Sequence, residues 1–292
     1  MILIAASAVG AALFLWPFFV STAPAPVVAL SLALGAVAVL AALETAARRL
    51  DARRFALLAA IAGIDTALRL VLVTGVGGFS PIFFLILCAG YIYGPSFGFL
   101  CGTVSLLASA VATGGIGPWL PYEMFGCGWT GVAAGVAGLH RRGAPGAGDI
   151  ALLVVVGIAA GYAYGALLDI WDWTTFYRGS PSFGFLPGAG TATLLQRFAR
   201  FYVATSAAWD TFRAAGDALA IVVLGAPVLA ALARVQSRLS FSVSHEWAPV
   251  VAGSACAPPS VTEAQLDGLH EEHHDGHEQI RGHRVHPDLP TP

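Results

Sequence analysis

The chain has 292 residues, of which 57% are hydrophobic and 11% are charged, whereas soluble proteins carry roughly a quarter charged residues. All 15 basic residues are arginine and the formal net charge is -2, so the sequence has neither a strongly basic surface for nucleic acid nor the lysine of a Walker A loop. This composition predicts an all-α polytopic membrane protein that binds no nucleic acid and has no ATPase site of its own.

Eight apolar runs approach the roughly 20 residues that a helix needs to cross a bilayer. They cover residues 3–20, 26–43, 55–74, 81–94, 97–113, 121–139, 150–170 and 206–233. If these runs alternate in direction, most arginines between them fall on one side, which the positive-inside rule assigns to the cytoplasm. We therefore expect about eight transmembrane helices in a lipid bilayer, with both termini cytoplasmic.

The chain divides into three predicted parts. Residues 1–47 hold a two-helix hairpin, and residues 48–239 hold a core of six helices. Residues 240–292 are polar and rich in histidine, and eight of the 17 acidic residues lie after His245. Histidines close together in a flexible chain can bind a divalent metal, but a solvated, disordered cytoplasmic tail without metal is the simpler expectation.

Glycines recur at four-residue intervals in two series, the first of which runs across the turn at Pro95 from one predicted core helix into the next, while the second lies in the run 150–170. The first series runs Gly90, Gly94, Gly98 and Gly102, and the second comprises Gly157, Gly161 and Gly165. This small-xxx-small spacing lets helix backbones approach closely, so we expect tightly packed helices at both places.

Aromatic and polar residues gather in predicted loops on the outer face. Trp119, Tyr122 and Glu123 occur in the segment GPWLPYEM. Trp and Tyr there can anchor the membrane interface or contact a solute, and an isolated acid that begins an apolar helix needs the helix N-terminus or a ligand to stabilise it. The long connection 171–205 supplies further candidates for a lid over a site, namely Trp171, Asp172, Trp173, Phe176 and Tyr177.

Charged residues inside the predicted spans occur at helical spacing. Asp65 and Arg69 are four residues apart, and Asp210 and Arg213, beside Trp209, are three apart. Such pairs share a helix face, where they either brace the bundle or contact a solute. Both interpretations stay open for each pair. The sequence has no GxSxG or HExxH motif and no histidine inside a span, which argues against a membrane-embedded enzyme.

The first core helix carries a stripe of small residues at its cytoplasmic end. Ala52, Ala56 and Ala60 follow one another at four-residue spacing. Ala56 and Ala60 therefore offer a surface on which a helix of another subunit can dock closely.

Three blocks of the sequence resemble a known family when they are taken together and in order. They are GGFSPIFFLILCAGYIYGPSFGFLCGTVSLLASAVATGGIGPWLPYEM, AGYAYGALLDIWDW and FYVATSAAWDTFRAAGDAL. With them the chain resembles, over roughly residues 10–240, the substrate-binding S components of energy-coupling factor (ECF) transporters. The similarity is to the type found in high-GC Gram-positive bacteria, in which two extra helices precede the six-helix core.

This resemblance implies a subunit of an ATP-driven importer in a bacterial cell membrane. Such a subunit binds a water-soluble vitamin outside and topples in the bilayer to deliver it inward. It works with a transmembrane coupling subunit, which packs on the alanine stripe, and with separate ATPase subunits. It needs no resident cofactor. The vitamin pocket lies at the outer ends of the helices, and the residues that we expect to bind substrate are Phe79, Trp119, Tyr122, Glu123, Trp209, Asp210 and Arg69.

The family motifs do not name the vitamin. The long aromatic connection suits a large ring system, so cobalamin is the first expectation and riboflavin the second. Two other classes of function remain: an ion-coupled secondary transporter that uses Asp65 and Glu123, and a membrane assembly protein that transports nothing.

Overall fold

A computed structural model describes residues 2–20, 22–46, 50–71, 82–141 and 143–239. Within these ranges the chain folds into helices, and the only β-type pairing is an isolated bridge between Arg178 and Phe185. The helices are α1 (Ile2–Phe19), α2 (Pro26–Ala46), α3 (Ala52–Val71), α4 (Ile82–Tyr93), α5 (Pro95–Thr113), α6 (Leu120–Gly138), α7 (Ala147–Thr175), α8 (Thr191–Thr205) and α9 (Ala207–Leu239). The all-helical class expected from the sequence is confirmed.

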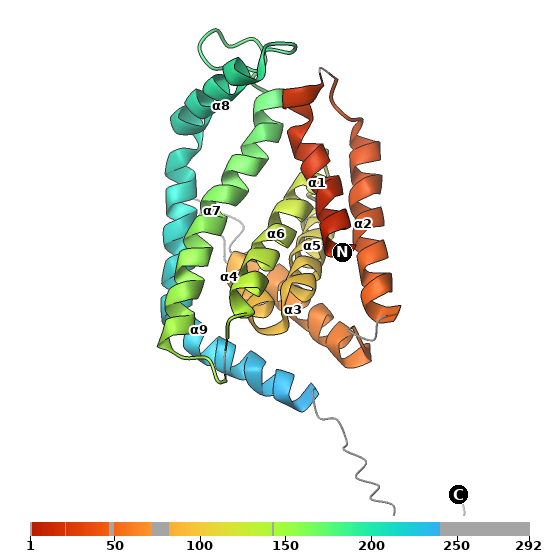
Figure 1. Ribbon diagram of the computed structural model, residues 1–292, viewed down its shortest axis with the longest axis vertical. Helices are drawn as coiled ribbons and strands as arrows, with labels where there is room; N and C mark the ends of the chain where they lie inside the picture. Colours follow the sequence, from red (N-terminus) through yellow and green to blue (C-terminus); the bar gives the residue numbers. More distant parts are fainter. Residues whose placement is uncertain (1, 21, 47–49, 72–81, 142, 240–292) are drawn as a thin grey trace, which may run out of the picture. The chain divides into compact units, whose positions relative to one another are not determined.

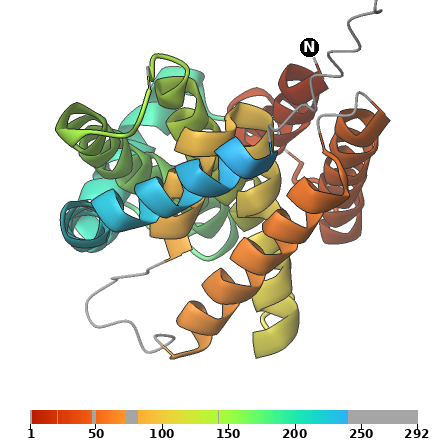
Figure 2. The same cartoon turned by 90° about the horizontal axis from the view of Figure 1, so that it is seen from below.

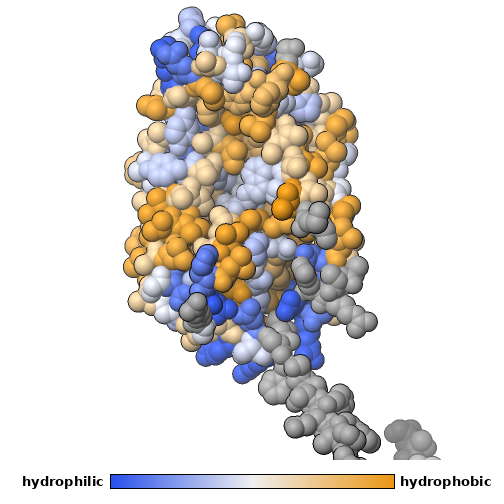
Figure 3. Space-filling model, in the orientation of Figure 1, coloured by the Kyte–Doolittle hydropathy of each residue, from blue (hydrophilic) through white to orange (hydrophobic). Residues whose placement is uncertain are grey.

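Several helices have the length and composition of membrane spans. Among the described residues, α2, α5, α7 and α9 are long and apolar enough to cross a bilayer, and α1 and α4 are apolar but shorter. In Figure 3, hydrophobic residues occupy most of the middle of the visible face, and hydrophilic residues gather toward its two ends. These features are those of a helical membrane protein, and the number of spans stays a prediction.

The helices α4, α5 and α6 pack backbone against backbone. Gly94 alone joins α4 to α5, and its φ of 94° is a conformation that glycine adopts readily. A methyl group on Gly90 or Gly98 would overlap the carbonyl oxygen of Gly131, and one on Gly102 would overlap that of Cys127. The close packing predicted from this glycine series is confirmed, with Gly94 serving the turn instead.

A second close contact joins α7 to α9. A methyl group on Gly161 would come within 3.4 Å of the backbone of Ala214, and one on Gly165 would overlap the carboxylate of Asp210. The packing role predicted for these glycines is therefore confirmed as well. In Figure 1, α9 changes direction toward its lower end, and Pro227 inside the helix accounts for a bend there.

The N-terminal hairpin of α1 and α2 packs on the core through α6. The ring of Phe14 lies 5.2 Å from that of Tyr122, and the indole of Trp129 donates a hydrogen bond to Ser7 Oγ, with a distance of 3.1 Å. All described residues belong to a compact unit that covers Met1–Ser242. The hairpin is thus attached near the start of α6, where candidate binding residues lie.

The helix α8 was not predicted from the sequence. It lies in the long connection between α7 and α9, at the top in Figure 1. Its Leu194 and Phe201 are buried in a small hydrophobic cluster with Trp16, Trp173 and Phe185, while other apolar side chains remain exposed. An amphipathic helix of this kind is typical of a membrane interface.

Candidate functional site at the start of α6

A cavity lies between the start of α6 and the end of α7. Its volume is ≈ 320 Å³. Its wall is formed by Trp119, Tyr122, Glu123, Leu168, Trp171, Asp172 and Phe176. The structure therefore brings together three of the residues expected to bind substrate, with three of the proposed lid residues opposite them. Leu168 was not singled out in the sequence, because a leucine in an apolar helix carries no distinguishing signal.

Aromatic rings form much of the cavity wall. The ring of Trp171 lies 6.0 Å from that of Trp119, 6.3 Å from that of Tyr122 and 5.5 Å from that of Phe176. The contacts with Trp119 and Phe176 are edge-to-face, a favoured geometry for aromatic pairs. Trp119 is 38% exposed and Tyr122 only 4% exposed, so one ring stands toward the opening and the other is held in the core.

Two acidic side chains also face this cavity. Glu123 and Asp172 line it, both are partly exposed, and they lie close enough to repel each other electrostatically. Arg69 of α3 lies near enough to stabilise the charge of Glu123, and its guanidinium donates a long hydrogen bond of 3.4 Å to Ser109 Oγ. Arg69 does not line the cavity itself.

The two remaining described candidates stand outside this cavity. Trp209 is 55% exposed. Asp210 is buried, forms an ion pair with Arg213 and accepts a hydrogen bond of 2.9 Å from the hydroxyl of Tyr202. In the described structure Asp210 therefore braces α8 and α9, one of the two roles left open by the sequence. Phe79 lies outside the described residues.

The segment between α7 and α8 is fastened by hydrogen bonds from side chains of both helices. The indole of the fully buried Trp173 donates to the carbonyl of Phe183 with a distance of 2.6 Å. Arg197 of α8 donates to the carbonyls of Gly184, Pro181 and Ser180, at 2.7, 3.2 and 2.8 Å. Trp173 of α7 is thus a structural anchor, whereas Trp171 of the same helix and Phe176 just after it face the cavity.

Three aspartates are buried with oxygens that lack a hydrogen-bond partner among the described residues. Asp65 of α3 is 0% exposed and lacks partners for both carboxylate oxygens, while Asp169 and Asp217 each lack one for Oδ2. Arg69, one turn from Asp65, is its closest charged neighbour on the same helix face. Asp169 was missed in the sequence, although an acid in the apolar stretch YGALLDIWDW was a signal for it.

The alanine stripe of α3 lies on the surface of the described unit. Ala56 and Ala60 are exposed, as are Phe55 and Ile64 on the same helix, at 59% and 56%. Figure 2 shows α3 along its length, with no other helix covering it over most of that length. The surface is apolar and has small side chains at its centre.

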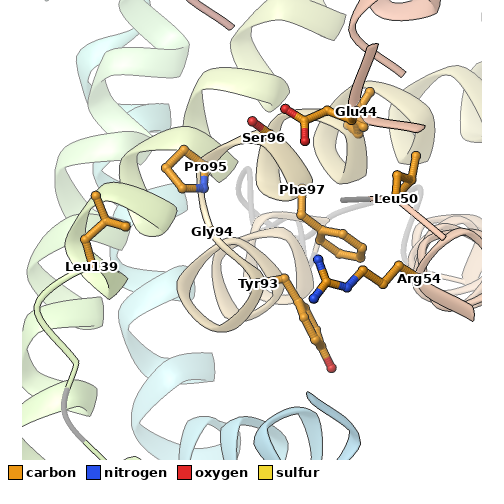
Figure 4. A pocket seen from close by; sticks show the side chains of 10 residues that line it. Glu44, Leu50, Arg54, Tyr93, Gly94, Pro95, Ser96, Phe97 and Leu139 are labelled. Carbon is orange, nitrogen blue, oxygen red and sulfur yellow. The ribbon is translucent and has the colours of Figure 1, made fainter. Parts of the chain in front are cut away.

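A second cavity, of ≈ 280 Å³, lies where the end of α2 and the start of α3 meet the α4–α5 turn. In Figure 4 the guanidinium of Arg54 lies between the rings of Tyr93 and Phe97, and Glu44 and Ser96 stand on another side of the cavity. The rings and the charged groups thus line a cavity at the junction between the hairpin and the core.

Comparison of the chain with protein-family models, with curated proteins and with solved structures finds no match.

Proposed function

We propose that this protein is the substrate-binding membrane subunit of an ECF-type importer, which captures a vitamin-like solute in the cavity between α6 and α7. One observation carries the proposal: four aromatic rings and two acids converge on a single cavity beside a fastened loop. Solute sites combine apolar walls with a few directed polar groups, as this cavity does. A transmembrane coupling subunit and separate ATPases supply the energy, since this chain has no lysine for a Walker A loop.

The size of the cavity bears on the choice of vitamin. Ligand pockets span roughly 300–1,000 Å³, and the ≈ 320 Å³ of this cavity is at the lower end. A ligand of one to three fused rings suits such a volume better than the corrin ring of cobalamin with its attached nucleotide. Riboflavin and smaller vitamins therefore come before cobalamin.

The exposed face of α3 supports the coupling role. Ala56 and Ala60 leave room for a partner helix to approach, and they are flanked by exposed apolar side chains that lipid or a partner can cover. This face is separate from the cavity residues, so binding of solute and docking of the partner use different surfaces.

Thermal unfolding of the full-length protein with a panel of vitamins tests the proposal. A ligand at one hundred times its Kd stabilises the folded protein by about 2.7 kcal/mol, which raises the unfolding temperature. Trp119→Ala should weaken binding of the stabilising vitamin by at least about tenfold, or about 1.4 kcal/mol. Trp209→Ala is the matched control, because Trp209 is exposed and does not line the cavity. If no vitamin stabilises the protein, the result contradicts the proposal and favours an assembly role.

Asp65 favours a second candidate, an ion-coupled secondary transporter. An acid that is fully buried in a membrane helix, with neither oxygen hydrogen-bonded to a described residue, is the kind of group that carries protons or sodium ions. Uptake that persists in ATP-depleted cells and is lost in Asp65→Asn would favour this candidate over the importer.

A further inference from the structure

We infer that the ligand of the α6–α7 cavity is an organic cation with a flat or compact charged group. This inference rests on the proposed function and names the substrate class of the same site. It follows from two properties of the cavity wall, which are its aromatic faces and its charges.

The aromatic residues are arranged around the cavity as a partial cage. Trp119 immediately precedes α6 and Tyr122 lies in its first turn, and Trp171 of α7 has its ring within 6.3 Å of both. Phe176, just after α7, extends the wall at 5.5 Å from Trp171. The faces of such rings are electron-rich and attract a cation that is held against them, most strongly in the case of tryptophan.

Among the described residues, the ionisable groups that line this cavity are negative or phenolic. Glu123 and Asp172 are the charged ones, and this described part of the wall holds no arginine or histidine. The two carboxylates repel each other, so a cation placed between them relieves that repulsion. An anionic ligand would instead be repelled by both.

The neighbouring cations leave part of this negative charge unmatched. Arg69 acts on Glu123 and Arg213 pairs with Asp210, but Asp172 has no ion pair or hydrogen bond with any described side chain. One turn before it on the same face of α7, Asp169 is 7% exposed and its Oδ2 lacks a hydrogen-bond partner among the described residues, but Ser206 and Arg213 both act on this carboxylate. Asp172 is thus a cavity-lining acid without a partner among the described side chains, and a bound cation near it supplies that partner.

Neutral ligands fit this wall less well than cations. An ionised carboxylate only accepts hydrogen bonds, so a neutral ring must present donors to Glu123 and Asp172 together, whereas a cation satisfies both through charge. The chemical class is therefore a quaternary or ring ammonium ion, or a protonated amine attached to a small ring.

Two pairs of probes, each matched in shape and different in charge, test the inference on the full-length protein in lipid nanodiscs. The first pair is nicotinamide methylated on its ring nitrogen, a permanent flat cation, and nicotinamide, its neutral parent. The second pair is choline and the alcohol in which carbon replaces its nitrogen. We expect each cation to bind at least tenfold more tightly than its neutral partner, as measured by calorimetry or by thermal stabilisation.

Charge-removing variants locate the effect. Glu123→Gln and Asp172→Asn should each reduce the preference for the cation by at least about fivefold while preserving side-chain shape. Glu44→Gln, which removes an acid from the cavity of Figure 4, is the matched control and should leave the preference unchanged. Unfolding temperatures of the unliganded variants show that each is folded.

The outcomes separate this inference from the proposed function. If a neutral or anionic vitamin stabilises the protein through Trp119 and the cations bind no better than their neutral partners, the cation inference is overturned and the proposed function stands. If a cation preference exists but survives both Glu123→Gln and Asp172→Asn, the assignment to this cavity is overturned. If no vitamin and no probe binds, both are overturned.

Discussion

At the scale of single residues, Arg197 of α8 fastens the segment between α7 and α8 by three hydrogen bonds. Its guanidinium donates to three carbonyls of the segment between α7 and α8, and that segment otherwise has few hydrogen bonds to the helices. Hydrogen bonds that involve a charged group contribute about 1.5–3 kcal/mol each to stability. The side chain therefore fixes the loop that borders the candidate cavity.

We expect Arg197→Ala to open this loop locally without unfolding the helices. Trypsin should then cleave after Arg178 at least about tenfold faster, since local opening becomes easier by about 1.4 kcal/mol or more. The measurement is the rate at which the fragment ending at Arg178 appears in a mass spectrum. Arg200→Ala is the control, because Arg200 is exposed on the same helix and forms no hydrogen bond with a described residue. Equal rates in both variants would show that Arg197 does not hold the loop.

Part of the candidate site could be predicted from the sequence, and the reason lies in local spacing. Trp119, Tyr122 and Glu123 are near neighbours at the start of one helix, so any fold that exposes one of them to a cavity tends to expose the others. Trp209 and Asp210 begin a different helix at the same end, but successive residues are rotated by about 100° about a helix axis. The sequence does not show which side of this helix faces the cavity. In the structure Trp209 is exposed, and Asp210 contacts Arg213 and Tyr202 instead.

At the scale of elements, glycine decides how closely α5 and α6 approach. A methyl group on Gly98 would meet the backbone of Gly131 rather than a flexible side chain, so the helices must separate to accept it. We expect Gly98→Ala to lower the free energy of unfolding by about 1–3 kcal/mol, as overpacking does elsewhere. The fraction that stays folded after heating in detergent measures the effect.

Gly35→Ala is the matched control for this substitution. A methyl group on Gly35 of α2 meets no atom within 4 Å, and alanine is the better helix former. The free energy of unfolding of Gly35→Ala should stay within about 1 kcal/mol of that of the parent protein or rise slightly. A loss as large as that of Gly98→Ala would mean that the glycines act through helix propensity rather than through contact.

The helices that were predicted and the helix that was missed differ in their hydrophobic signal. Runs of apolar residues long enough to cross a bilayer stand out in any sequence, and the described helices α1 to α7 and α9 each correspond to one of them. The sequence of α8, TATLLQRFARFYVAT, mixes arginines with apolar residues. Its apolar positions recur at helical spacing, so the signal was its periodicity and not its mean hydropathy.

At the scale of the whole molecule, the exposed face of α3 should serve coupling rather than binding. Ala56→Trp combined with Ala60→Trp places two large rings where a partner helix is proposed to dock, while the cavity residues are untouched. We expect uptake and co-purification of the coupling subunit to be lost with the Kd for solute unchanged. Val222→Trp, at an exposed apolar position of α9, is the control and should retain both. An intact complex and full uptake in the double variant would place the docking surface elsewhere.

The arginines predict which connections between helices lie on each side of the membrane. With eight spans, the α6–α7 connection lies in the cytoplasm and the α7–α8 connection outside, because the arginines concentrate on the side of the former.

Cysteines at Ala144 and Ser182 report on these two connections, and both positions are exposed. The nearby Gly143 and Gly179 are unsuitable, since their positive φ values of 77° and 86° would strain a cysteine. Of the native cysteines, Cys88, Cys101 and Cys127 are buried, and Cys256 is replaced by alanine to remove its signal. A membrane-impermeant maleimide added to intact cells should label Ser182→Cys and spare Ala144→Cys. The reverse pattern would mean that the protein has the opposite orientation, and labelling of both would require an even number of crossings, or none, between the two connections.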